Sequence, residues 1–260
     1  GLNIRTPDGI LDQEARLQDH KREAMVAWLA ANGINKTVLP GGANPKVGII
    51  TAGKSYLDVR QALEDLGLDA ARCDEMGVRL MKLGCTWPVV PAEIRAFAQG
   101  LDLIIVVEEK RSLIETQVRE ELYGVPHQPI LVGKRDEAGE WLFPVKASLD
   151  PNLIGVAIGQ RLLKFHDDAA LRGAVGRLVQ ARAMVAEIKQ EATRTPYFCS
   201  GCPHNRSTVI PEGARAYAGI GCHYMAQFMD RRTDGYTQMG GEGANWVGES
   251  RFSKRGHVFQ

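Results

Sequence analysis

The segment Leu101-Asp102-Leu103-Ile104-Ile105-Val106-Val107 decides the fold class. Its apolar side chains fill consecutive positions, so both faces of the strand that it predicts must be buried. Strands buried on both faces are typical of parallel sheets that are covered by helices. A shorter apolar run, Lys46-Val47-Gly48-Ile49-Ile50-Thr51, predicts a second strand upstream. We therefore expect a parallel sheet at the centre of the fold.

Strand-like and helical patterns alternate on both sides of these two runs. We expect strands at 78–83 and 130–132, and helices at 55–66, 92–99 and 112–123. Ser55 is expected to cap the first of these helices, and Ser112 with Glu115 forms a capping box at the start of the last. Glu108 and Glu109 follow the strongest strand, where carboxylates commonly cap a helix. This alternation predicts a three-layer α/β domain with helices on both faces of the sheet.

The chain divides into regions that differ in composition and in hydrophobic periodicity. A helix is expected at 11–32, before a Gly- and Pro-rich linker, and two further helices are expected at 152–165 and 168–191. We expect four regions: an N-terminal helix and linker at 1–45, an α/β domain at 46–165, a connecting helix at 166–192, and the first part of a second α/β domain at 193–260. The chain breaks off in an apolar run at its C-terminus, which indicates a segment of a longer polypeptide.

Composition excludes several classes of protein. Lys plus Arg number 32 and Asp plus Glu 31, a formal net charge of +1, so no excess of basic residues favours nucleic-acid or membrane-surface binding. The apolar runs are too short to cross a bilayer, and no signal-peptide pattern opens the chain. Five Cys, an odd number, do not suggest a disulfide framework. We expect a cytoplasmic protein with no nucleic-acid or membrane partner.

Three Cys in Gly-rich turns carry the strongest chemical signal. Cys199 and Cys202 form a C-x-x-C pair, and Cys222 closes the turn Gly219-Ile220-Gly221-Cys222. Thiolates two residues apart on a tight turn can bind one metal centre. Spacing alone leaves three interpretations open: a [4Fe–4S] cluster with its fourth ligand outside the chain, a zinc site completed by His204 or His223, or unligated thiols. A thioredoxin-like pair is disfavoured, because this pair lies in a loop and not at a helix start.

The same motifs resemble those of a known enzyme family. The stretch 197–204, Tyr-Phe-Cys-Ser-Gly-Cys-Pro-His, resembles the signature that opens the diphosphate-binding domain of indolepyruvate ferredoxin oxidoreductases. The turn 219–222 resembles that family's Gly-Ile-Gly-Cys turn. The stretch 239–246 resembles the next Gly-rich turn, in the form typical of the long fused bacterial members. Upstream, residues 46–163 resemble the transketolase-C-terminal-like domain of these thiamine-diphosphate-dependent enzymes.

The resemblance implies specific roles for residues of the second region. By position, Cys199, Cys202 and Cys222 would be three of four thiolate ligands of the [4Fe–4S] cluster nearest to thiamine diphosphate. Gly221, Cys222, Gly240, Gly241 and His204 would be candidate cofactor-binding residues. No catalytic residue is assigned. Cys73 and Cys85 match no ligand motif and are expected to be ordinary buried or half-buried thiols.

One departure limits what this chain can do alone. Enzymes of this class hold Mg²⁺ and the diphosphate through a Gly-Asp-Gly motif, and no such motif occurs in the 260 residues. The resemblance implies oxidative decarboxylation of a 2-oxoacid, indolepyruvate or another arylpyruvate, to an acyl-CoA with electrons passed to ferredoxin. It implies coenzyme A as co-substrate, a site completed by the rest of the polypeptide or a partner subunit, and a homodimer. Two alternatives remain: a non-catalytic zinc-stabilised interaction module, and a paralogue of the family that lacks the cluster.

Overall fold

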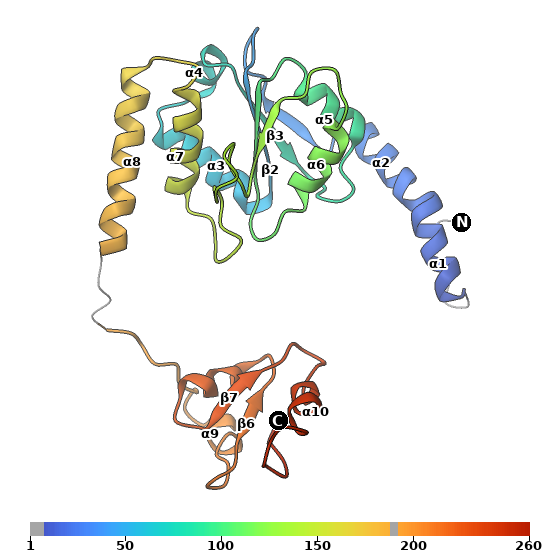
Figure 1. The fold of residues 1–260 in the computed structure, drawn as a ribbon, viewed down its shortest axis with the longest axis vertical. Helices are drawn as coiled ribbons and strands as arrows, with labels where there is room; N and C mark the ends of the chain where they lie inside the picture. Colours follow the sequence, from blue (N-terminus) through green and yellow to red (C-terminus); the bar gives the residue numbers. More distant parts are fainter. Residues whose placement is uncertain (1–7, 188–191) are drawn as a thin grey trace. The chain divides into compact units, whose positions relative to one another are not determined.

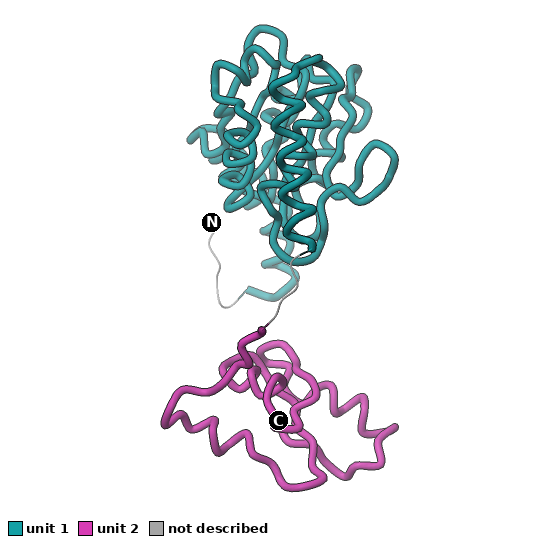
Figure 2. Tube along the Cα trace, turned by 90° about the vertical axis from the view of Figure 1, so that its left-hand side faces the viewer, with its two compact units in different colours: residues 1–188 teal, residues 189–260 magenta. Residues whose placement is uncertain are grey.

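The structure, a computed structural model, describes residues 8–187 and 192–260. It divides into two compact units, residues 1–188 and 189–260 (Figure 2). Each unit is described by itself.

The first unit is built on a five-stranded sheet with the order β1-β3-β2-β4-β5 (Figure 1). The strands are β1 Lys36–Leu39, β2 Val47–Ala52, β3 Val78–Leu83, β4 Leu103–Val107 and β5 Ile130–Val132. Strands β2 to β5 run parallel. Every residue of β4 is buried, because helices cover both faces of the sheet. The expected three-layer α/β fold is therefore confirmed.

Helices form the two outer layers of this unit. They are α3 Gly53–Asp65, α4 Ala70–Glu75, α5 Pro91–Ala98, α6 Ile114–Leu122, α7 Pro151–Leu162 and α8 Ala169–Glu187. Helices α3, α7 and α8 share one apolar core with the sheet, and α5 and α6 share the other (Figure 1). Two glycines let α7 approach its neighbours closely, since a Cβ on Gly155 or Gly159 would lie 2.6 Å from Leu178 or 2.4 Å from Val175.

Strand β1 was not expected from the sequence. It pairs antiparallel with β3 at the edge of the sheet, with Lys36 opposite Lys82 and Thr37 opposite Met81. The stretch lies in the region expected to be a helix and linker, and its four residues are too few to show a clear two-residue period. An edge strand is half-covered, so it lacks the continuous apolar run that marks β2 and β4.

The capping box expected at Ser112 is wrong. Helix α6 begins at Ile114, and the groups that cap it come from the end of β4. The Glu108 carboxylate accepts backbone N–H bonds from Leu113 at 3.0 Å, Ile114 at 2.9 Å and Glu115 at 3.0 Å. The expectation that Glu108 caps this helix is confirmed. A buried carboxylate fixed by the strand satisfies the N–H groups that Ser112 was expected to cap.

The cap expected at Ser55 is also wrong. Helix α3 begins two residues earlier, directly after β2, and its N-cap Ala52 offers no side-chain hydrogen bond. Ser55 therefore lies inside the first turn, and only 4% of it is exposed. The strand runs into the helix through Gly53, whose φ of +55° is costly for other residues.

Two helical segments flank the sheet domain. The expected N-terminal helix is present as α1 Ile10–Arg16, a π-helical turn Leu17–Lys21 and α2 Arg22–Ala31, and Leu29 is its one buried residue among those described. Helix α8 is the expected long helix, and residues 188–191, predicted to end it, lie outside the described residues. Cys73 is buried and Cys85 half-buried, as expected.

The second unit is small. A two-stranded parallel sheet, β6 Ala216–Ala218 and β7 Thr233–Tyr236, is surrounded by α9 His204–Ser207, a 3₁₀ helix Cys222–Phe228 and α10 Ala244–Glu249. The C-terminal segment adds a further backbone pairing. Phe259 donates to Arg215 at 2.9 Å and accepts from Tyr217 at 2.8 Å, so it lies beside β6. This arrangement is a mixed α/β unit.

A buried hydroxyl in β2 gives a stability prediction. Thr51 is completely buried, and its hydroxyl has no hydrogen-bond partner within the described part of the chain. Replacing it with Val keeps the shape and removes an unsatisfied polar group. We expect Thr51→Val to raise the free energy of unfolding by about 1 kcal/mol, measured by urea denaturation. Thr37→Val on the exposed edge strand is the control, and a destabilised Thr51→Val would show that the hydroxyl has a partner.

The salt bridge at Glu137 gives a pH prediction. Its carboxylate binds Arg161 at 2.6 Å and Lys164 at 2.9 Å. Burial would raise the pKa of Glu137, but hydrogen bonds from its own backbone, Lys164 and Arg161 outweigh burial and lower the pKa from 4.5 to about 2. A lowered folded-state pKa stabilises the fold above the unfolded value, and this contribution is lost as pH falls from about 4.5 toward 2.

Glu137→Gln is therefore expected to destabilise the protein at pH 7 more than at pH 3. Urea midpoints at both pH values measure the difference, and the exposed Glu140 supplies a matched Glu140→Gln control. An equal loss for Glu137→Gln at both pH values would contradict the assigned charge pair.

Candidate functional site

Two Gly-rich loops follow the parallel strands of the second unit. Strand β6 ends at Ala218 and leads into the turn 219–222, and β7 ends at Tyr236 and leads into the loop 238–243. The carboxyl ends of parallel strands meet at the same edge of a sheet, which is where ligands bind in open α/β sheets. Both Gly-rich motifs singled out in the sequence therefore lie at the binding edge of this unit.

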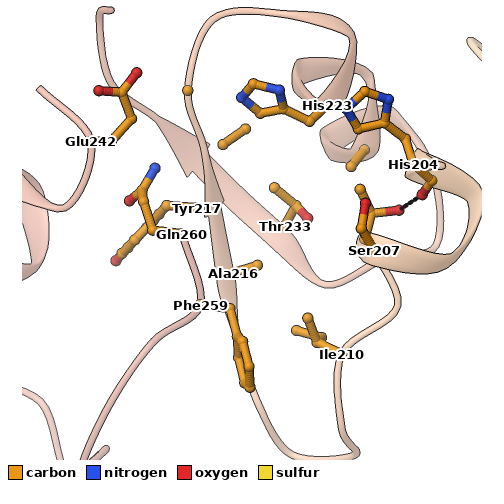
Figure 3. Close-up of a pocket in the computed structure, with 14 residues that line it drawn as sticks. His204, Ser207, Ile210, Ala216, Tyr217, His223, Thr233, Glu242, Phe259 and Gln260 are labelled. Atoms are coloured by element: carbon orange, nitrogen blue, oxygen red, sulfur yellow. Dashed lines mark hydrogen bonds between the residues drawn. The ribbon is translucent and has the colours of Figure 1, made fainter. Parts of the chain in front are cut away.

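A cavity of about 440 Å³ lies along β6, from Ala216 at the start of the strand to Gly219 beyond its end (Figure 3). Its wall includes the buried strand residues Ala216, Ala218 and Thr233, and its polar groups include His204, His223 and Glu242. Ser207 at the end of α9 and Thr208 directly after it also line the cavity. The cavity thus has an apolar floor and a rim of titratable side chains, as expected of a small-molecule site.

The two histidines bring the Cys-bearing segments together. The rings of His204 and His223 stack with centroids 6.0 Å apart. The ring of Phe198 also stacks on His204, with centroids 5.3 Å apart. Cys202 lies two residues before His204, and its Sγ is 3.2 Å from the His204 Nδ1. Cys222 directly precedes His223. The segment 199–204 and the turn 219–223 are therefore neighbours in the fold.

Glycine at 219 and 221 keeps these side chains close to the backbone. A Cβ on Gly219 would lie 2.8 Å from Glu242 Oε1 and 3.2 Å from His223 Nε2. A Cβ on Gly221 would lie 3.0 Å from the His223 ring, and its φ is +153°. Side chains at either position would displace the titratable groups, so the turn requires glycine for close approach.

The loop after β7 is held by contacts at the opposite end of α10. Glu249 accepts a hydrogen bond from Arg215 at 2.8 Å and another from the Tyr217 hydroxyl, which fixes α10 to β6. Gly243 donates its N–H to the Gln260 side chain at 3.0 Å. These contacts position Glu242 at the cavity rim.

The predicted site residues differ in how they relate to the cavity. His204 lines it, whereas the three Cys and Gly221, Gly240 and Gly241 belong to the segments beside it. Cys199 and Cys222 are exposed and Cys202 is half-buried, and all three are free thiols. Gly201, in the turn between the first two, has a φ of +75°.

Sequence reasoning missed most of the cavity wall. Glu242 was visible only as the centre of a Gly-Glu-Gly stretch, and Tyr217 and Thr233 carry no motif. They line the cavity because β6 and β7 present them there. Gln260 reaches the rim only through the pairing of the C-terminal segment with β6. No sequence signal marks a contact of that kind.

The side chains do not converge on a preformed metal site. Across residues 8–187 and 192–260, no group of three or more His, Cys, Asp or Glu is arranged so that it could hold a metal ion. The donors are nevertheless thiols on adjacent segments, and thiolates are ligands that iron–sulfur centres and zinc select.

No described helix is long and apolar enough to cross a membrane.

The fold and site define an α/β protein with a mostly parallel sheet, followed by a Cys- and Gly-rich unit with a polar cavity. The family model described as the Indolepyruvate oxidoreductase domain matches residues 37–185, more than half of the chain. The chain therefore belongs to the indolepyruvate oxidoreductase domain family. The matched residues run from β1 into α8 of the first unit.

Curated relatives carry the same family name. The chain is 38% identical over 81 residues to the indolepyruvate oxidoreductase subunit IorA of Pyrococcus abyssi, covering 31% of this chain and 11% of the relative. It is 28% identical over 184 residues to the IorA subunit of Methanothermobacter marburgensis, covering 70% and 25%. The chain thus spans a quarter or less of the length of these two relatives.

Two solved structures share weak similarity. A 2-oxoglutarate:ferredoxin oxidoreductase from Magnetococcus marinus, with 2-oxoglutarate, coenzyme A and succinyl-CoA bound, matches with a TM-score of 0.37 and 21% identity over 49% of this chain and 19% of that chain. A split-gene transketolase matches with a TM-score of 0.34 and 17% identity, over 50% and 41%. Likenesses of this strength assign no function.

Proposed function

We propose that this chain is part of a thiamine-diphosphate-dependent 2-oxoacid:ferredoxin oxidoreductase that acts on indolepyruvate or another arylpyruvate. The reaction would be oxidative decarboxylation to an acyl-CoA, with coenzyme A as co-substrate and ferredoxin as electron acceptor. The observation that carries the proposal is that three segments, the Cys-bearing stretch 199–204, the turn 219–223 and the Gly-rich loop 238–243, contribute His204, His223 and Glu242 to one cavity beside β6 and β7. Membership in the indolepyruvate oxidoreductase domain family supports it.

The three thiols have the chemistry that a [4Fe–4S] cluster needs, but their side chains do not converge on one point. Cys199, Cys202 and Cys222 would supply three thiolate ligands, and a fourth would come from outside this chain. All three are free thiols, and Cys199 and Cys222 are exposed. When bound, the cluster would carry electrons away from the cofactor.

The chain's own residues would serve the cofactor in other ways. Backbone N–H groups at Gly221 and Gly240 would approach a diphosphate closely, since a Cβ on Gly240 would meet nothing within 4 Å. The Gly241 N–H donates to the Gln238 carbonyl at 2.9 Å, so Gly241 would serve the cofactor by shaping the loop. His204, stacked between Phe198 and His223, is positioned to hold a proton at the cavity rim. The apolar floor would exclude water from the reacting carbon. Thiamine diphosphate would supply the decarboxylation chemistry itself.

The Mg²⁺ that clamps a diphosphate does not fit this chain alone. No Gly-Asp-Gly motif is present in the sequence, and Gly241-Glu242-Gly243 lies in the earlier of the expected loops. The metal would therefore be held by the rest of the polypeptide or by a partner subunit. The similarity of 239–246 to long fused bacterial members favours the same polypeptide, in a cytoplasmic homodimer.

Analysis of the full-length protein, purified without oxygen, tests the proposal. We expect iron and sulfide in cluster proportion, and a brown absorption band that bleaches when an arylpyruvate and coenzyme A are added. Stoichiometric zinc without a visible band would contradict it. That outcome would favour a zinc-stabilised interaction module, in which His204 or His223 completes the ligand set.

A further inference from the structure

The first unit has a cavity at the point where the order of its strands reverses. From β2 the chain moves to β3 on one side, and later to β4 on the other side of β2. Ligands in open α/β sheets bind beyond the carboxyl ends of two strands that diverge in this way. Here those ends are Ala52 and Val107, and a cavity of about 330 Å³ opens beyond them.

The start of α3 forms one wall of this cavity. Gly53, Lys54 and Ser55 line it, and they are the first three residues of a helix of 13 residues. The N-cap Ala52 provides no side-chain acceptor, and the first turn contains no acidic residue. The N–H groups of a helix's first turn have no partner within the helix, and the helix dipole favours an anion beside them.

Ser55 supplies an independent indication that a ligand binds. Only 4% of the residue is exposed, and it lines the cavity, yet its hydroxyl makes no hydrogen bond to any other described residue. Buried hydroxyls normally have a partner, and the Ser55 oxygen, unlike that of Thr51, is not fully enclosed, so a ligand in the cavity can reach it. An oxygen acceptor in the cavity would provide that partner.

Two cations and two carboxylates line the cavity, and three of these four side chains already have partners. Both oxygens of Glu108 are occupied by the N–H groups of α6, and Glu109 accepts from Leu149 at 3.2 Å. Lys54 pairs with Asp58 at 2.7 Å and with Glu109 at 3.6 Å, and its hydrogen bond to Asp58 raises its pKa. Arg111 lines the cavity and has no ion-pair partner in the described ranges. Arg111 is therefore the lining cation that remains available to an anionic ligand.

A sequence pattern agrees in part with this assignment. Residues 48–55, Gly-Ile-Ile-Thr-Ala-Gly-Lys-Ser, match the Gly-x₄-Gly-Lys-Ser spacing of nucleotide-binding loops. In the structure Gly48 lies inside β2, where a Cβ would be 2.4 Å from Leu101, and no loop separates β2 from α3. A loop that wraps a triphosphate is thus absent. Gly53, Lys54 and Ser55 at the helix start remain, which suits a single phosphate group.

We propose that this cavity binds the phosphate group of a small molecule, held by the first turn of α3, the Ser55 hydroxyl and Arg111. The site belongs to the first unit and is distinct from the Gly-rich loops proposed for thiamine diphosphate. Its ligand is either free phosphate or a phosphate monoester.

Amide NMR shifts of the full chain, titrated with orthophosphate at constant ionic strength, test this proposal. We expect saturable shifts at Gly53, Lys54 and Ser55. Ser55→Ala and Arg111→Gln should each weaken binding about tenfold, the loss of one charge-assisted hydrogen bond. Lys36→Gln, which removes the same charge from the edge strand, should bind as the parent does. Without phosphate, Ser55→Ala should be at least as stable as the parent, since it removes an unpartnered hydroxyl.

Glycerol 3-phosphate distinguishes the two sources of phosphate. Tighter binding than orthophosphate would support a monoester ligand, and equal or weaker binding would support free phosphate. Shifts that chloride reproduces, or that survive in both Ser55→Ala and Arg111→Gln, would overturn the proposal. Because these variants lie in the first unit, failure here leaves the proposed oxidoreductase function untouched.

Discussion

Glu108→Ala is expected to lower the free energy of unfolding of the first unit by about 3 kcal/mol. The Glu108 carboxylate accepts the N–H groups of Leu113, Ile114 and Glu115, and only 7% of the residue is exposed. Alanine would leave these three donors at the start of α6 without an acceptor. The buried Lys134, which donates to the Glu108 carbonyl, would also lose a nearby opposite charge.

The measurement is urea denaturation followed by tryptophan fluorescence in a Trp246→Phe background, which leaves Trp28, Trp87 and Trp141 to report on the first unit. Glu108→Gln keeps one acceptor oxygen and should lose less. Glu120→Ala, on the exposed face of α6, is the matched control and should change the free energy by no more than about 0.5 kcal/mol. A loss below 1 kcal/mol for Glu108→Ala would show that the cap contributes little.

Cys222→Ala in the full-length protein should reduce bound iron and sulfide to less than about a tenth of the parent's content. The proposed cluster has three ligands in this chain, and Cys222 alone comes from the turn after β6. Cys199→Ala and Cys202→Ala should have the same effect. The thiolate is the metal ligand, so alanine removes a bond that no neighbour can replace.

Cys85→Ala is the control, since Cys85 is half-buried in the first unit and its Sγ contacts the Trp87 carbonyl at 3.1 Å. It should retain iron and the visible spectrum. Iron retained in Cys222→Ala would remove this residue from the ligand set. Zinc lost in place of iron would point to the interaction module.

The strands and the chemically distinctive loops were accessible from sequence. Leu103–Val107 is a buried central strand because its side chains are apolar at every position. This pattern can be recognised in the segment itself, without knowing which strands lie beside it. The Gly-rich turns were also recognisable, since clustered glycines favour turns. Gly201 and Gly240 do have positive φ in the structure. By contrast, Ser112 was predicted as a cap from local spacing, and a carboxylate from β4 caps the helix instead.

The sequence alone determined the α/β fold class, the places of β2 to β5, and the positions of the three Cys relative to Gly-rich turns. These features depend on the burial and backbone conformation of short segments, which local composition records. The tertiary structure alone decided that β1 runs antiparallel, that His204 stacks on His223, and that Ser55 and Arg111 line one cavity. Such contacts join segments that are far apart in the chain. They depend on the order of the strands in the sheet, which the hydrophobic periodicity of a single segment does not encode.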